Sequence, residues 1–113
     1  MSGRGVKRRS PAPLFAALGD ETRLRLVVQL GGGAPRSIAQ LTHGTRLTRQ
    51  AITKHLRVLE GAGMVRGVRA GREMHYRLTP EPIDEARRYL DAVSAQWDHA
   101  LARLKAFVEK DAR

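Results

Sequence analysis

Apolar residues recur along most of this chain at the three- and four-residue spacing of amphipathic helices, and in one stretch they alternate as in a strand. The helical spacing predicts helices over residues 14–18, 21–30, 37–42, 48–61 and 80–111. Strand character over 64–69 and 72–78, with Ala70–Gly71 as the turn, predicts a β-hairpin before the last helix. The order α-α-α-α-β-β-α predicts a mainly α fold.

Capping residues mark where three of these helices begin. Asp20 and Thr48 are good N-caps, and Ser37 is followed by Gln40 at the spacing of a capping box. Glycines at 31–33 and 61–63 are expected to end the second and fourth helices. The second helix carries Leu24, Val27, Val28 and Leu30 among its apolar residues.

The fourth predicted helix, over 48–61, has one apolar and one polar side. At 100° per residue, Ile52, His55, Leu56 and Leu59 fall on the apolar side, where His55 is expected to pack or to hydrogen-bond, or alternatively to reach a phosphate. The opposite side carries an amide, a hydroxyl and cations, and no acid before Glu60: Arg49, Gln50, Thr53, Lys54 and Arg57. Such side chains bind base edges and phosphates, so the pattern favours the reading helix of a helix-turn-helix over an ordinary solvated helix.

The predicted hairpin over 64–78 is strongly basic. Its arginines are Arg66, Arg69, Arg72 and Arg77, and Glu73 is its only acid. A basic hairpin directly after a candidate reading helix is typical of a winged helix-turn-helix. Its wing is expected to follow the phosphates or to enter the minor groove.

The charge distribution agrees with binding to a polyanion. The chain of 113 residues has 21 Lys and Arg against 11 Asp and Glu, a net charge of +10. Residues 1–79 hold 15 basic and 4 acidic residues, whereas residues 80–113 hold 6 and 7. We therefore predict a basic flexible tail over 1–13, a DNA-binding domain over 14–79 and a C-terminal dimerisation helix over 80–113 that forms one compact domain with 14–79. Because the last helix carries no excess positive charge, binding to a membrane surface is disfavoured.

The last helix has a continuous apolar seam. Its residues are spaced alternately by three and four: Ile83, Ala86, Leu90, Val93, Trp97, Ala100, Leu104 and Phe107. A stripe of this length on a small monomer favours a symmetric dimer over a helix lying across its own domain. The predicted dimer interface consists of Leu14, Phe15, Leu18, Leu90, Val93, Trp97, Leu101, Leu104 and Phe107.

With these elements placed, the sequence resembles the ArsR/SmtB-type winged-helix transcription regulators. The resembling segments are ALGDETRLRL (17–26), SIAQL (37–41), LTRQAITKHLRVL (47–59), GAGMV (61–65) and GREMHYRL (71–78). The resemblance implies a homodimer that binds near-palindromic operator DNA and usually represses transcription. The predicted DNA-binding residues are Ser37, Thr48, Arg49, Gln50, Thr53, Lys54, Arg57, Arg69 and Arg72. A nonspecific nucleoid-type DNA-binding protein and a protein-interaction adaptor are the alternatives.

Two features depart from the family's common pattern. The turn over 42–47 looks longer than usual, and the chain has no cysteine of the kind that metal-sensing members use. The last helix offers Asp91, Asp98, His99 and Glu109, with only one histidine, whereas a zinc site needs three or four converging ligands. We therefore predict no metal and no cofactor, as in the non-metal-sensing branch, and the sequence contains no recognisable effector motif.

No catalytic pattern is present. None of the four histidines lies in a paired metal or triad motif, and no phosphate-binding or nucleophile loop occurs. The apolar runs are too short for a membrane span, and no secretory signal is visible. We predict a cytoplasmic protein that is not an enzyme.

Overall fold

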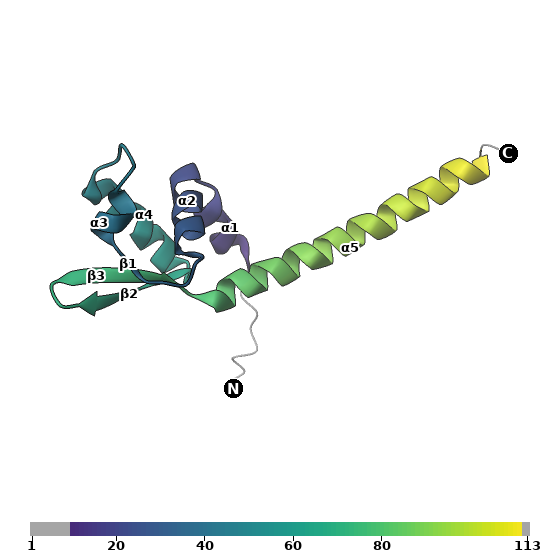
Figure 1. The fold of residues 1–113 in the computed structure, drawn as a ribbon. Helices are drawn as coiled ribbons and strands as arrows, with labels where there is room; N and C mark the ends of the chain where they lie inside the picture. The colour runs from purple at the N-terminus through teal and green to yellow at the C-terminus, as the bar shows by residue number, and fades with distance from the viewer. Residues whose placement is uncertain (1–9, 112–113) are drawn as a thin grey trace, which may run out of the picture.

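The computed structural model describes residues 10–111 and confirms a mainly α winged helix-turn-helix (Figure 1). Its helices and strands are α1 (Ala12–Leu18), α2 (Glu21–Leu30), β1 (Arg36–Ser37), α3 (Ile38–Thr42), α4 (Arg49–Gly61), β2 (Val65–Ala70), β3 (Glu73–Leu78) and α5 (Pro80–Asp111). Helix α1 begins at Ala12, so it takes up the end of the tail predicted over 1–13. Residues 1–9 of that tail lie outside the described residues.

The predicted caps hold the starts of three helices. The side chain of Asp20 accepts a hydrogen bond from a backbone N–H of α2, and Thr48 does the same for α4. Ser37 and Gln40 form the predicted capping box, each side chain accepting from the other residue's N–H. These bonds satisfy N–H groups that have no partner within their own helix, which is why the helices begin at these positions.

The hairpin of β2 and β3 is antiparallel, and its turn lies one residue later than predicted. Ala70 pairs with Glu73, so the two turn residues are Gly71 and Arg72 rather than Ala70–Gly71. Gly71 has a φ of +65°, in the left-handed region that a residue without a Cβ enters at no steric cost. The shift places Arg72 at the tip of the wing.

A third strand, which the order α-α-α-α-β-β-α omitted, completes the sheet. Arg36 pairs with Tyr76 and Ser37 with His75, giving the strand order β1-β3-β2. Strand β1 is only two residues long, so no alternation could reveal it. Because it continues directly into α3, it ties the helix-turn-helix to the wing.

The core lies between α2, α3, α4 and the start of the hairpin. Its fully buried large side chains are Leu26, Leu30, Leu41, Ile52, Leu56, Leu59 and Met64. Within α2, Leu26 is buried, whereas Leu24 is 47% and Val28 73% exposed. Leu26 and Leu30 are one turn apart and face the core, and Leu24 and Val28 lie on another side of the helix.

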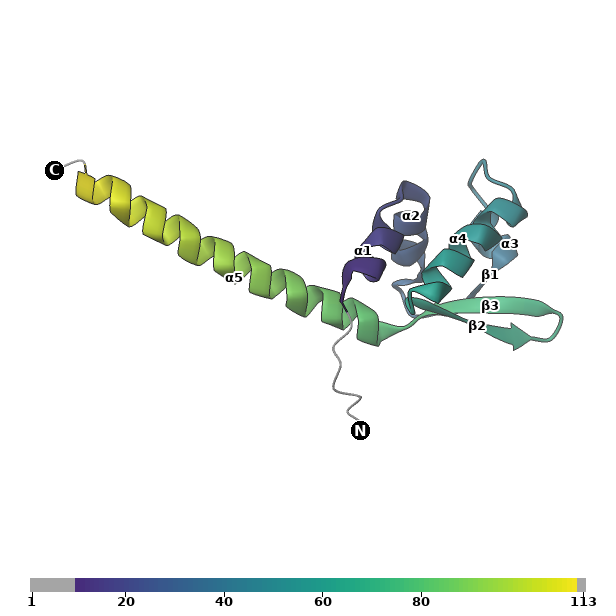
Figure 2. The same cartoon turned by 180° about the vertical axis from the view of Figure 1, so that it is seen from behind.

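Helix α5 leaves the domain as a long rod (Figures 1 and 2). Ala86 is buried, Ile83 packs against the core, and Leu90 is already half exposed. The molecule measures 72 × 44 × 21 Å, and its radius of gyration is 19.6 Å, against about 13 Å for a compact domain of this length. Of the described part of α5, the first turns therefore pack against the rest of the domain.

Candidate nucleic-acid interface

Helix α4 presents its predicted polar side to the outside. Arg49, Gln50, Lys54 and Arg57 are exposed, while the other side of the same helix supplies three fully buried side chains to the core. Thr53 is half-buried, and its hydroxyl donates to the carbonyl oxygen of Arg49 at 2.7 Å. The amphipathic pattern thus anchors α4 by one side and leaves an amide and three cations on the other.

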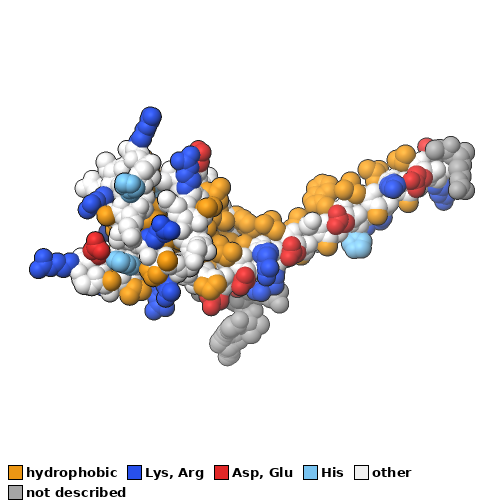
Figure 3. Space-filling model, viewed as in Figure 1, with side chains coloured by type: hydrophobic (Ala, Val, Ile, Leu, Met, Phe, Trp, Pro, Cys, Tyr) orange, Lys and Arg blue, Asp and Glu red, His pale blue; other side chains and the backbone are white. Residues whose placement is uncertain are grey.

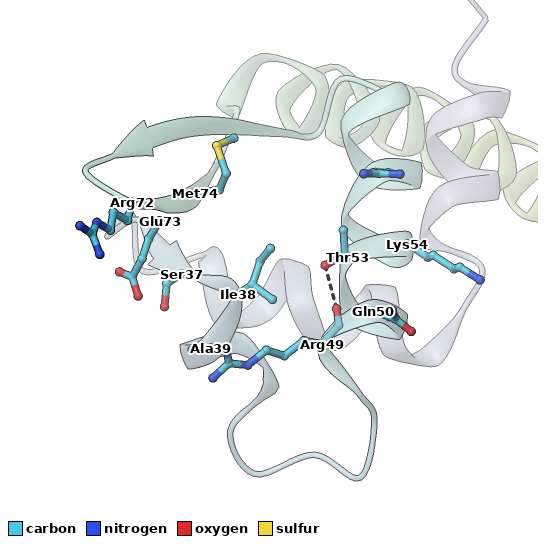
Figure 4. Close-up of a pocket in the computed structure, with 11 residues that line it drawn as sticks. Ser37, Ile38, Ala39, Arg49, Gln50, Thr53, Lys54, Arg72, Glu73 and Met74 are labelled. Carbon is cyan, nitrogen blue, oxygen red and sulfur yellow. Dashed lines mark hydrogen bonds between the residues drawn. The ribbon is translucent and has the colours of Figure 1, made fainter.

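A groove runs between α4 and the wing (Figure 4). Its floor and far wall come from the start of α3 and from the hairpin, through Ile38, Glu73 and Met74 among others. Seven of the nine residues predicted to bind DNA line it: Ser37, Arg49, Gln50, Thr53, Lys54, Arg57 and Arg72. Residues from three separate elements therefore share one concave surface.

The other two predicted residues lie outside the groove. Thr48 is exposed at the start of α4, where its hydroxyl oxygen accepts from the N–H of Ala51 at 3.1 Å. Arg69 is exposed on β2, opposite Met74 near the tip of the wing.

The groove is positively charged. Its cations are Arg49, Lys54, Arg57 and Arg72, and its only acid is Glu73. An Oε1 atom of Glu73 lies 3.2 Å from Nε2 of His75. Glu73 was not assigned to the site from sequence, although its position beside Arg72 in the wing would have allowed it. Four cations against one carboxylate make this surface attractive to a polyanion.

Ser37 is buried at the groove, only 5% exposed. Its hydroxyl oxygen accepts from the N–H of Gln40 at 3.1 Å, and its backbone N–H donates to the side chain of Gln40 at 2.8 Å. Its observed contacts therefore hold α3 in place.

The exposed length of α5 carries an uncovered apolar seam (Figure 3). Trp97 is 63% and Phe107 68% exposed, Leu90, Leu101 and Leu104 are more than half exposed, and Val93 is half-buried. Of the residues predicted on the first helix, Phe15 and Leu18 keep exposed surface, whereas Leu14 is buried in its own core. Leu14 therefore has little surface left for a partner.

The base of α5 is fixed to α1 by an aromatic contact. The rings of Phe15 and Tyr89 lie 5.9 Å apart between centroids, at an interplanar angle of 52°. This tilted arrangement is a favourable geometry for two aromatic side chains. It places α1 beside the point where the seam leaves the domain.

Neither a metal site nor a membrane span is indicated within residues 10–111. No three His, Cys, Asp or Glu residues in this part of the chain are grouped as they would be around a metal ion. Among the described helices, none has the length and apolar character needed to span a bilayer.

Comparison with known proteins places this architecture in a family. The model of a helix-turn-helix domain matches residues 18–68. The HTH-type transcriptional regulator Rv2034 of Mycobacterium tuberculosis is 31% identical over 103 residues, which are 91% of this chain and 92% of that protein. The arsenic resistance transcriptional regulator ArsR1 of Pseudomonas putida is 33% identical over 72 residues, or 64% of this chain. This chain spans only 56% of the length of ArsR1, and 63% of that of the M. tuberculosis repressor SmtB.

A solved structure shows the same arrangement over most of the chain. The ArsR-like transcriptional regulator from Rhodococcus sp. RHA1 has a TM-score of 0.73 and 39% sequence identity, and the match covers 86% of this chain and 91% of that one. Together with the relative that is 31% identical over 91% of the chain, this match confirms the resemblance found in the sequence. The chain belongs to the ArsR family of helix-turn-helix transcriptional regulators.

Proposed function

We propose that this protein is a homodimeric, sequence-specific repressor that binds a near-palindromic operator. Helix α4 enters the major groove, and the wing formed by β2, β3 and their turn contacts the DNA backbone or the minor groove. The observation that carries the proposal is the groove lined by Gln50 and three exposed cations of α4 on one side and by Arg72 of the wing on the other. A regulator must reach the chromosome, so we place it in the cytoplasm.

The exposed side of α4 has the chemistry needed to read bases. The major groove is about 12 Å wide and admits one α-helix, and an amide such as that of Gln50 can bind both N6 and N7 of an adenine. Arg49 and Lys54 flank Gln50 on the exposed side of the helix, where they can reach guanine or phosphate oxygens. Gln50 is therefore the residue that we assign to sequence discrimination.

The apolar seam of α5 is the surface through which we expect a second protomer to bind. Two protomers joined by this helix present two α4 helices related by a two-fold axis. Such a pair suits half-sites one helical turn apart, about 34 Å, or a multiple of that distance. This symmetry is the reason to expect a near-palindromic operator.

The test is to compare Gln50→Ala with a matched control, Gln29→Ala, which removes an exposed amide from α2 and not from the groove. We expect Gln50→Ala to weaken operator binding by about 1–3 kcal/mol, or about 5- to 150-fold, because one bidentate base contact is lost. The affinity of Gln50→Ala for a random duplex should stay close to that of the wild type. Gln29→Ala should bind both operator and random duplexes with wild-type affinity.

Titration of labelled duplexes and a footprint of the intergenic DNA beside the gene give these values. Equal losses on operator and random DNA for Gln50→Ala would remove it from base reading. A wild type that gives no footprint of defined length would favour the nonspecific nucleoid-type alternative.

The wing should act on all sequences alike. Arg72→Ala is expected to weaken binding to every duplex and to lower the slope of log affinity against log salt by about one. Glu73→Gln should do the opposite and strengthen binding to every duplex by about two- to fivefold, the scale of one exposed charge pair. Salt titrations on operator and random DNA measure both effects, and a sequence-dependent change for either variant contradicts this role.

A further inference from the structure

The side chain of Arg23, in the first turn of α2, connects two helices with different proposed tasks. Its Nε donates to the carbonyl oxygen of Ala17, in the last turn of α1, at 2.6 Å. Its Nη1 lies 3.3 Å from Nδ1 of His55, on α4. Both contacts are partly buried, so this guanidinium forms a bridge from α1 through α2 to α4.

The contacts of Arg23 satisfy a free carbonyl group at the end of α1 and the donors of the partly buried guanidinium itself. The last carbonyl groups of a helix have no partner within it, and a guanidinium can satisfy one of them while its other N–H groups remain available. A partly buried cation is stable only when its donors are bonded and a negative charge is near. Asp20 provides that charge, since a hydrogen bond from the backbone N–H of Arg23 holds the pKa of the Asp20 carboxyl below its usual value.

His55 lies on the flank of α4 between the buried side and the groove. It is half-buried and directly follows Lys54, and its contact with Arg23 agrees with the hydrogen bond expected there from the sequence. The Nδ1 atom of His55 also lies 3.7 Å from the Oδ2 atom of Asp20. Both partners of this Nδ1 come from α2 and its N-cap, since Asp20 is the residue at which α2 begins. The ring is therefore held from α2 and leaves the groove side of α4 free.

We propose that Arg23 and His55 are positioning residues, which fix the orientation of α4 relative to α1 and so determine where the groove-facing side chains point. This inference rests on the proposed function. Helix α1 carries Phe15, which contacts the base of α5 through Tyr89, so the bridge links the start of the apolar seam to the reading helix. Side chains that read bases must be held to within about 0.5 Å, and a small rotation of α4 would misplace Gln50.

The experiment is a double-mutant cycle with Arg23→Met, His55→Leu and the double variant. For each, affinities for operator and for a random duplex are measured by titration, and the folded fraction by circular dichroism. We expect each single variant to lower the ratio of operator affinity to random-duplex affinity by about tenfold. The double variant should lower this ratio no further than the more severe of the two single variants, because the effects of substitutions at contacting residues do not add. Arg25→Met is the matched control, because Arg25 is an exposed arginine on the same helix and should leave the ratio unchanged.

Each possible result either supports or overturns the positioning role of Arg23 and His55. Losses that are equal on both duplexes, or that add in the double variant, would show a purely structural role or a phosphate contact and overturn the inference. If the wild type discriminates and Arg23→Met discriminates equally well, the inference fails and the proposed function stands. If the wild type does not discriminate, the proposed function fails and the inference falls with it. Should Arg23→Met unfold, His55→Leu, which keeps the bond to Ala17, must show the selective loss by itself.

Discussion

Trp97→Glu is expected to leave the protein monomeric and to weaken operator binding by at least about 100-fold, because one half-site can no longer assist the other. Trp97 lies in the middle of the seam and is 63% exposed in the single chain. A buried Trp is a major source of interface energy, and a carboxylate in its place would enter an apolar interface without a partner. Sedimentation or light scattering at micromolar concentration gives the mass, and titration of operator DNA gives the affinity.

The control for this variant is Ala95→Glu, which adds the same charge to an exposed position on the outer side of α5. In the heptad that contains Leu90, Val93 and Trp97, position 95 lies opposite the seam. It should remain dimeric and bind operator as the wild type does. An unchanged mass for Trp97→Glu would contradict the dimer seam, and a wild-type monomer that forms a stable heterodimer would favour the protein-interaction adaptor.

Leu56→Ala is expected to lower the free energy of unfolding by about 2–5 kcal/mol, the usual cost of a cavity at a fully buried leucine. Leu56 is 0% exposed on the inner side of α4. Val58→Ala is the control two residues further along the same helix, where the side chain is 45% exposed, and it should change stability by no more than about 0.5 kcal/mol. Urea titration at one protein concentration measures both, and equal losses would mean that the inner side of α4 is not the core.

The helix starts could be predicted because they depend on neighbouring residues. Asp20, Ser37 and Thr48 each bond to an N–H three residues away, so a short window contains the whole interaction. Strand β1 could not be predicted, because Arg36 and Ser37 become a strand only through pairing with β3, 38 or more residues later. The buried face of α2 could not be predicted for the same reason, because the positions of other helices decide that Leu26 is covered and Val28 is exposed.

The candidate site also has one part that local sequence predicts and another part that only the tertiary fold creates. The exposed side of α4 follows from its own periodicity, which placed Gln50 and Lys54 correctly on the outside. The groove does not, since Glu73 and Met74 reach it only through the folding of the hairpin. The bridge of Arg23 to His55 joins residues 32 positions apart, and in the sequence both look like ordinary members of amphipathic helices.

The long helix α5 uses one side for two purposes. Ile83 and Ala86 pack within the protomer, and the same line of residues continues outside the domain through Leu90 and Trp97. Since each residue turns a helix by about 100°, inserting one residue between Ala86 and Leu90 would swing the outer part away from its partner, while seven residues bring it back to within about 20°. The stretch that links domain and seam can therefore change length only in steps that complete whole helical turns, such as seven or eleven residues, if its two ends are to stay in phase.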